Sequence, residues 1–188
     1  MLNICGIIAF LMLYVYDLNL IYKKNRFLKN FFMIGSSVIV LTTLINIIIY
    51  FPKSWNFTMI VYTILALLSC GGLIYTLFFA LDVEKAYGND CCDQTCIKSG
   101  IYALCRHPGV IWMALMYLFL YLAFKNEDML FMLVVYNGLN LGYVILQDII
   151  IFPKQFVDYQ QYKKIVPFLI PTIKSLKECI RSFQEVAK

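Results

Sequence analysis

The sequence has few charged residues and a single histidine. Only 14% of its 188 residues are Asp, Glu, Lys or Arg, whereas 62% are apolar and the mean hydropathy is +0.76. These values exclude a soluble globular domain. The net charge of +5 comes from basic residues that lie between long apolar runs. That distribution argues against a nucleic-acid-binding surface and is typical of membrane topology signals.

Two common sequence signatures are missing as well. Cys91, Cys92, Cys96 and Cys105 lack the paired CxxC spacing of a zinc site, so no metal is expected. The first residues contain neither a basic stretch nor a small-residue cleavage site. We therefore expect residues 1–22 to form a membrane anchor and not a signal peptide.

Apolar runs of about 20 residues, the length that crosses a bilayer as a helix, dominate what is present. Five such runs cover residues 1–22, 31–51, 57–81, 109–124 and 129–152. The fourth is short, which favours a tilted or partial crossing. The predicted fold is all-α: a polytopic integral membrane protein with about five transmembrane helices and a C-terminal amphipathic helix.

Basic residues predict the orientation of these helices, because cytoplasmic segments are enriched in Lys and Arg. They fill the first loop, the third loop and the tail after the last span. We expect the N-terminus outside and the C-terminus in the cytoplasm. We also expect one membrane domain over residues 1–188, built from a three-helix bundle (1–81), a cytoplasmic loop (82–108), a helical hairpin (109–152) and a cytoplasmic tail (153–188).

The only histidine stands in a polar turn before the fourth apolar run. Arg106 and His107 precede Pro108, which suits the first turn of a helix and keeps the residue before it extended. The N–H groups at a helix N-terminus attract anions. The turn therefore indicates a site for a charged small molecule at the membrane surface. Alternatively, Arg106 belongs to the basic flank that sets topology and His107 has no special role.

Polar side chains form one stripe on the last predicted span: Asn137, Asn140, Gln147 and Asp148. Such a stripe must face other helices or a wet cavity. Interhelical hydrogen bonding explains the two asparagines. A carboxylate at Asp148 needs a cation, and Arg106 is available at the same depth.

Small residues predict close helix packing in two spans. Gly71 and Gly72 lie in the third span, and Gly138 and Gly142 form a GxxxG step in the fifth. The first span carries the intramembrane carboxylate of Asp17. Because Lys23 follows about one turn later, we expect Asp17 to extend toward that lysine.

The tail contains two tyrosines one helical turn apart, Tyr159 and Tyr162, and then Pro167 and Pro171. Residues 175–178 resemble a capping box. One apolar face follows, made of Ile173, Leu176, Ile180, Phe183 and Ala187. This pattern predicts an amphipathic helix lying on the cytoplasmic interface.

The order of these motifs resembles the isoprenylcysteine carboxyl methyltransferase family and the related membrane phospholipid methyltransferases. That family has a Gly-X-Tyr and an Arg-His-Pro, then a membrane hairpin, a Glu-Glu pair, and a Tyr-X-X-Tyr with Val-Pro shortly after. The resemblance covers residues 99–171 of this chain. Here the acidic pair is Gln147-Asp148, and Val110, Ile111 and Trp112 stand where the family has an aromatic residue and a glycine.

The resemblance implies an enzyme that transfers a methyl group from S-adenosylmethionine to a lipidic or prenylated substrate at the cytoplasmic membrane face. It implies catalytic roles for Arg106, His107 and Asp148. The implied cofactor-binding residues are Tyr102, Arg106, His107, Pro108, Gln147, Asp148, Tyr159 and Tyr162.

Physical chemistry suits these roles, because an arginine fork can hold the cofactor carboxylate and an acid can accept from its ammonium. The glycine-rich turn of soluble nucleotide-binding domains is absent, so helices and their loops must build the site. The expected partners are the lipid bilayer and an amphiphilic or lipid-tailed substrate, with neither metal nor nucleic acid.

Two other functions remain open. Sterol reductases share a related C-terminal half, which suggests an NADPH-dependent membrane reductase. That reaction needs more cations for the extra phosphate than the predicted cytoplasmic loop offers. The third possibility is a non-catalytic membrane scaffold, which the altered acidic pair supports.

Overall fold

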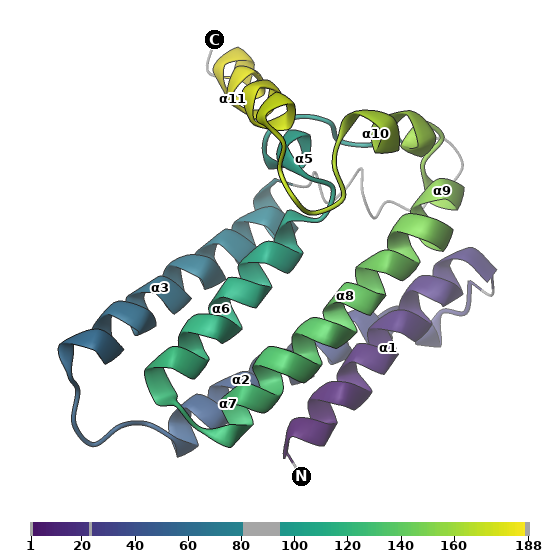
Figure 1. Ribbon diagram of the computed structural model, residues 1–188. Helices are drawn as coiled ribbons and strands as arrows, with labels where there is room; N and C mark the ends of the chain where they lie inside the picture. Colours follow the sequence, from purple (N-terminus) through teal and green to yellow (C-terminus); the bar gives the residue numbers. More distant parts are fainter. Residues whose placement is uncertain (1, 23, 81–94, 187–188) are drawn as a thin grey trace.

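The computed structural model describes residues 2–22, 24–80 and 95–186 (Figure 1). Within these ranges the chain is helical and contains no β-strand. Four helical segments are long and apolar enough to cross a membrane: Leu2–Tyr22, Phe27–Ile49, Phe57–Phe79 and Glu127–Gln155. The prediction of an all-α membrane protein agrees with this architecture. The fifth expected span is a helix of 17 residues, Pro108–Phe124, so a count of five crossings stays a prediction.

Several of the long helices change their winding along their length. The first two spans are α1 (Leu2–Tyr22) and the 3-10 turn η1 (Phe27–Asn30) with α2 (Phe31–Ile49). α3 (Phe57–Ile74) continues into the π-helical turn η2 (Tyr75–Phe79), and α5 (Ile101–Leu104) precedes α6 (Pro108–Phe124). The last span joins α7 (Glu127–Phe131), η3 (Met132–Tyr136), α8 (Asn137–Leu146), η4 (Gln147–Ile151) and α9 (Phe152–Gln155). The tail forms α10 (Tyr159–Ile165) and α11 (Ile173–Val186).

Local sequence signals set the ends of these helices. Pro108 occupies the first turn of α6, as expected. α6 ends at Phe124, and Lys125, directly after it, adopts a left-handed conformation with φ of 49°. The side chain of Asn126 then accepts a hydrogen bond from the Met129 N–H at 2.9 Å and caps the next helix. This turn produces the predicted hairpin.

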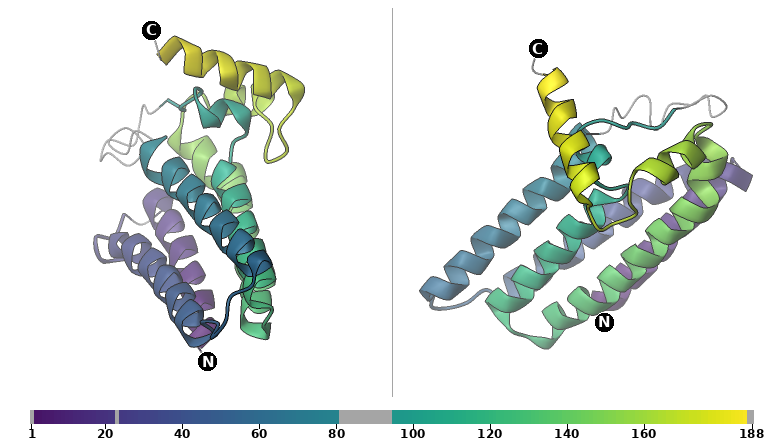
Figure 2. Two further views of the ribbon diagram at one scale, coloured as in Figure 1. Left: turned by 90° about the vertical axis from the view of Figure 1, so that its left-hand side faces the viewer. Right: turned by 45° about the horizontal axis from the view of Figure 1, so that its top comes forward.

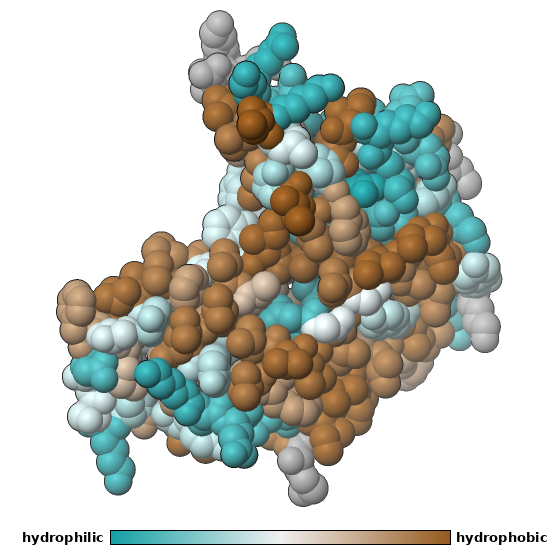
Figure 3. Space-filling model, viewed as in Figure 1, coloured by the Kyte–Doolittle hydropathy of each residue, from teal (hydrophilic) through white to brown (hydrophobic). Residues whose placement is uncertain are grey.

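The helices form a bundle in which α3 packs along α6 and α1 packs along both α2 and α8 (Figures 1 and 2). Its centre is filled by large side chains, among them Phe10, Tyr117, Met132 and Tyr136, none more than 1% exposed. The outside is apolar over most of the face in Figure 3. Contiguous apolar surface of this extent marks contact with lipid.

Polar contacts tie the bundle together at the end that carries the α6–α7 turn. The side-chain amide of Asn3 donates to Asp128 Oδ1 at 2.5 Å, and that of Asn46 donates to Asn3 Oδ1 at 3.1 Å. The Tyr50 hydroxyl also donates to Asp128. By contrast, the Asn137 amide donates to the Leu133 carbonyl of its own helix, so for Asn137 the expected interhelical bond is wrong.

The tail helix α11 lies across the other end of the bundle (Figure 2, left). It packs on α5 through small side chains such as the buried Ser175 and Cys179, while Ile173 and Ile180 are exposed. The predicted capping box at residues 175–178 is wrong. Thr172 and Ser175 exchange side-chain bonds to each other's N–H at 2.9 and 3.1 Å, so Thr172 is the capping residue and the helix begins three residues earlier, at Ile173. Its position on a membrane interface stays a prediction.

Glycines allow close packing at positions that only partly match the expectation. A Cβ added to Gly72 would lie 2.5 Å from the Trp112 ring, so α3 and α6 approach closely there, as predicted. Gly142 faces the Tyr14 hydroxyl, whereas Gly138 has no neighbour within 4 Å. The GxxxG step is therefore not a helix seam, because Tyr14 reaches across it to donate to the Leu139 carbonyl at 2.9 Å.

Gly35 offers a test of the packing between α1 and α2. A Cβ at this position would lie 2.8 Å from the Ala9 carbonyl oxygen, and backbone cannot move as a side chain can. We expect Gly35→Ala to lower the free energy of unfolding in detergent by about 1–3 kcal/mol. The matched control Gly138→Ala has open space and should be neutral or stabilising by about 0.5–1 kcal/mol. Equal effects of the two substitutions would contradict this packing.

Candidate functional site

Asp148 is the centre of a buried cluster formed by three separate chain segments. Its carboxylate is in η4, 5% exposed. Arg106 Nη1 lies 3.0 Å from Oδ1, and Lys163 Nζ lies 2.8 Å from Oδ2. The Tyr159 hydroxyl donates to Oδ1 at 2.6 Å, and His107 Nε2 is 3.4 Å from the same oxygen. The predicted proximity of the Arg106–His107 turn and Asp148 is confirmed.

Backbone bonds hold the arginine–histidine turn against the tail. The Arg106 N–H donates to the Pro167 carbonyl at 2.9 Å, and the His107 N–H donates to that of Phe168 at 3.3 Å. The His107 ring stacks on Phe152 and meets the edge of Phe168, with centroids 5.8 and 5.1 Å apart. The Phe168 ring also lies 5.5 Å from the Arg106 guanidinium carbon. Aromatic rings therefore restrict water around both side chains.

The widened helical turn η4 turns adjacent side chains toward different neighbours. Asp148 faces Arg106, whereas the Gln147 amide donates to Asp17 Oδ2 on α1 at 2.8 Å. Pro153, which has no N–H, follows directly after this turn. π-helical turns inside α-helices are frequent at functional sites.

Arg106 has hydrogen-bonding capacity that the described protein groups do not use. Its side chain is only 10% exposed, yet Nε and Nη1 lack a hydrogen-bond acceptor among the described residues. Nη1 is close to Asp148 but not aligned for a hydrogen bond. A buried donor without an acceptor costs about 1–3 kcal/mol. These donors are therefore a place where an anionic group would bind favourably.

The ionisation of the surrounding groups follows from burial. Burial lowers the pKa of His107 below 6.5, although Asp148 opposes the shift, so the ring is neutral at pH 7. Burial, with the Asp148 charge, raises the pKa of Tyr159, and burial raises the pKa of Tyr162. Burial likewise raises the pKa of the Cys105 thiol to about 11. The tyrosines act as hydrogen-bond donors, and Cys105 is not an activated nucleophile.

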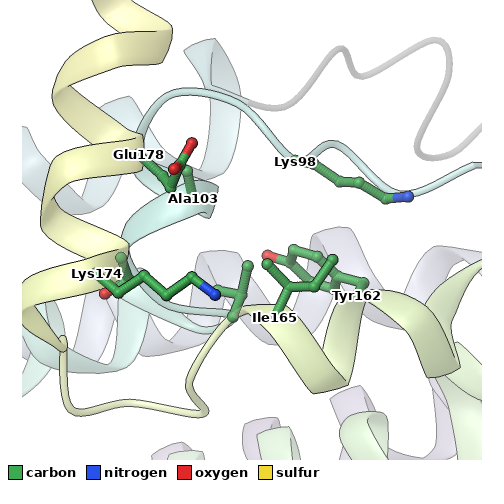
Figure 4. A pocket seen from close by; sticks show the side chains of 8 residues that line it. Lys98, Ala103, Tyr162, Ile165, Lys174 and Glu178 are labelled. Carbon is green, nitrogen blue, oxygen red and sulfur yellow. The ribbon is translucent and has the colours of Figure 1, made fainter.

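A pocket of about 210 Å³ opens between α10 and the start of α11, and none of its lining residues contacts Asp148 (Figure 4). Its walls combine apolar and charged side chains: Lys98, Ala103, Tyr162, Ile165, Val166, Lys174, Ser175 and Glu178. Tyr162 belongs to the predicted site residues as well. Pockets for whole cofactors usually measure about 300–1,000 Å³, so this one is large enough for only part of a nucleoside cofactor.

The remaining predicted site residues lie near the cluster without touching Asp148. The Tyr162 hydroxyl donates to the Tyr102 carbonyl at 2.7 Å, and the Tyr102 hydroxyl donates to the Thr76 carbonyl at 2.8 Å. Pro108 is buried at the start of α6. Gly100, which opens α5 with φ of 62°, holds the turn before Tyr102 in a conformation that favours glycine.

Two charged residues of the site were not predicted. Lys163 contacts the Asp148 carboxylate and also donates to its backbone carbonyl at 3.2 Å. Its position four residues after Tyr159 places both on one face of α10, a signal present in the sequence. Asp17 is 4% exposed and accepts a hydrogen bond from Gln147, and its expected contact with Lys23 stays a prediction. Lys23 itself lies outside the described residues, as do Cys91 and Cys92.

Comparison of the chain with known protein families, curated proteins and solved structures finds no match. Among the described residues, no group of three or more His, Cys, Asp or Glu side chains is arranged to hold a metal ion. The function is therefore argued from the geometry of the Asp148 cluster and from the motif resemblance.

The Asp148 cluster should contribute strongly to stability. Asp148→Asn leaves Arg106 and Lys163 without their counter-ion, which we expect to lower the free energy of unfolding by about 3–5 kcal/mol. The matched control is Asp158→Asn, which removes a more exposed pair with Lys98 and should cost less than about 1 kcal/mol. Denaturation of both variants in detergent, followed by circular dichroism, measures the difference. Similar losses would show that the cluster is not specially stabilising.

His107 should make stability depend on pH. Its folded pKa lies below 6.5, so the unfolded chain binds the proton more readily and stability falls as pH decreases below about 6.5. The charges that face the ring are Arg106, Asp148 and Lys163. We expect the wild type to lose up to about 1.4 kcal/mol per pH unit relative to His107→Gln between pH 6.5 and 5. Parallel pH profiles of the two proteins would contradict the lowered pKa.

Proposed function

We propose that this protein is a membrane methyltransferase that uses S-adenosylmethionine to methylate a lipidic or prenylated substrate at the cytoplasmic face. The observation that supports it most directly is the buried Arg106 guanidinium: its Nη1 forms an ion pair with Asp148, while Nε and Nη1 have no hydrogen-bond acceptor among the described residues. The cofactor carries a carboxylate and an ammonium on the same carbon atom. An arginine with unused donors next to an acid fits that pair of charges.

Several residues would hold the cofactor. Arg106 would bind the carboxylate with its planar fork, Asp148 would accept from the ammonium, and Gln147 would accept from another donor. Tyr162 and the apolar wall of the adjacent pocket would contact the nucleoside. When bound, the cofactor supplies a methyl group activated on a sulfonium. The protein contributes orientation and exclusion of water, which dominate the rate of such a displacement.

The protonation state of His107 suits more than one methyl acceptor. A carboxylate acceptor needs no base, whereas an amine must lose a proton before it reacts. Burial lowers the pKa of His107, so the imidazole is neutral at pH 7 and has a nitrogen lone pair that can accept that proton. The resemblance favours the carboxylate of a prenylated substrate.

A lipid-tailed substrate would reach this site through the bilayer. Ile149, the chain neighbour of Asp148, is 63% exposed on the outer surface of the last span. The last span thus presents an apolar outer surface at the depth of the cluster. The tail of the substrate would stay in the hydrocarbon region while its polar end lies at the depth of Asp148.

One observation supports a second function, a non-catalytic scaffold. Asp148 is already satisfied by protein groups, which are Arg106, His107, Tyr159 and Lys163. In that case the cluster is a clamp that joins α6, the last span and α10. Arg106 Nε and Nη1, which lack a hydrogen-bond acceptor in the part of the chain that the structure describes, argue against a purely structural role, because a clamp would gain nothing from such donors. No contact in the described residues favours the NADPH reductase.

Calorimetric titration of the purified protein in lipid nanodiscs separates these functions. We expect S-adenosylmethionine and S-adenosylhomocysteine to bind and NADPH not to bind. Arg106→Lys should weaken binding at least about ten-fold, because a lysine cannot form the two-pronged contact. The control Arg26→Lys, in an exposed loop, should bind as the wild type. Transfer of a labelled methyl group to membrane lipids or to a prenylcysteine analogue then identifies the acceptor.

Each other outcome points to a different function. Binding of NADPH alone would favour the reductase. Absence of binding by all three ligands to a folded protein would favour the scaffold.

A further inference from the structure

A second buried carboxylate, Asp17, lies at the same end of the bundle as Asp148. It is 4% exposed, and its Oδ2 accepts a hydrogen bond from Gln147 Nε2 at 2.8 Å. α1 and the last span run side by side in the same direction (Figure 1). Asp17 and Asp148 therefore lie on two neighbouring helices. Gln147 connects them, because it is the chain neighbour of Asp148.

The bond to Asp17 sets the orientation of the Gln147 amide. A primary amide has two donors on nitrogen and acceptor lone pairs on oxygen. Because Nε2 donates one of its two protons to Asp17, the nitrogen end of the amide faces α1 and Oε1 is its acceptor end. Without Asp17, the amide could turn and exchange the places of its donors and its acceptor.

Asp17 also changes the charge balance of the site. The groups in direct contact with Asp148 include two cations, Arg106 and Lys163, and His107 is neutral at pH 7. One carboxylate against two cations leaves an excess of one positive charge. S-adenosylmethionine, whose sulfonium and ammonium together outweigh its single carboxylate, would be repelled by that excess. A carboxylate at Asp17, one amide away, offsets it.

We propose that Asp17 is a positioning residue that makes this site selective for a cationic ligand. It orients the Gln147 amide and balances the charge of Arg106 and Lys163. This inference rests on the proposed function, and it assigns to α1 a part in ligand recognition that lies outside the motif region of residues 99–171.

S-adenosylmethionine and its thioether S-adenosylhomocysteine differ by the one positive charge of the sulfonium. Comparing how tightly each compound binds therefore tests the role of Asp17. We expect Asp17→Asn to weaken binding of S-adenosylmethionine about ten-fold and binding of the thioether less than about two-fold. A purely structural contact between α1 and the last span would weaken both equally. Titrations use the full chain in nanodiscs, and a thermal melt of each variant confirms that it is folded.

Two further variants sharpen the comparison. The double variant Asp17→Asn with Gln147→Glu restores one carboxylate to this pair of residues. The amide then stands at position 17 and the carboxylate at position 147. We expect it to regain most of the preference for the sulfonium. Asp128→Asn removes a carboxylate at the other end of the bundle, where Asn3 binds it, and should leave the preference unchanged.

The failures of the two proposals differ. A folded wild type that binds neither compound overturns the proposed function and this inference together. A wild type that binds both, with Asp17→Asn changing both affinities equally or neither, overturns only the role of Asp17. Loss of the preference in Asp128→Asn would also overturn it, since the effect would not be specific to this pair.

Discussion

The carboxylate of Asp148 is the group around which one end of this protein is arranged. Moving a carboxylate from water into a protein interior costs several kcal/mol unless cations and hydrogen-bond donors approach it closely. Arg106, Lys163 and Tyr159 meet this requirement, and they come from two segments far apart in the chain. The start of α6, the last span and α10 are therefore held together by one ionic centre.

The hydrogen-bonding capacity of Asp148 is used more fully than that of Arg106. Asp148 has partners on both oxygens, whereas Arg106 Nε and Nη1 have no hydrogen-bond acceptor among the residues that the structure describes. Such an imbalance is costly in a site with no ligand and favourable in one that binds an anion. The aromatic rings of Phe152 and Phe168 strengthen the effect, because they limit the access of water to both His107 and Arg106.

Local patterns in the sequence were sufficient to predict most helices. The expected run 31–51 corresponds to α2, Phe31–Ile49, and Pro108 begins α6 as its chemistry requires. Boundaries that depend on competition between neighbouring side chains were harder. Thr172, and not Ser175, caps the N-terminus of α11. The side chain of Tyr14 lies across the surface between Gly138 and Gly142 of α8.

The sequence by itself determined the helical membrane character of this protein and brought Arg106, His107 and Asp148 together as candidates. It did so because hydropathy and helix ends are local properties, and because a buried acid needs a cation. Only the tertiary structure decided that Gln147 turns away to Asp17 and that Lys163 completes the cluster. Those partners depend on how α1 and α10 pack against the last span. No local pattern specifies a contact between side chains 130 residues apart.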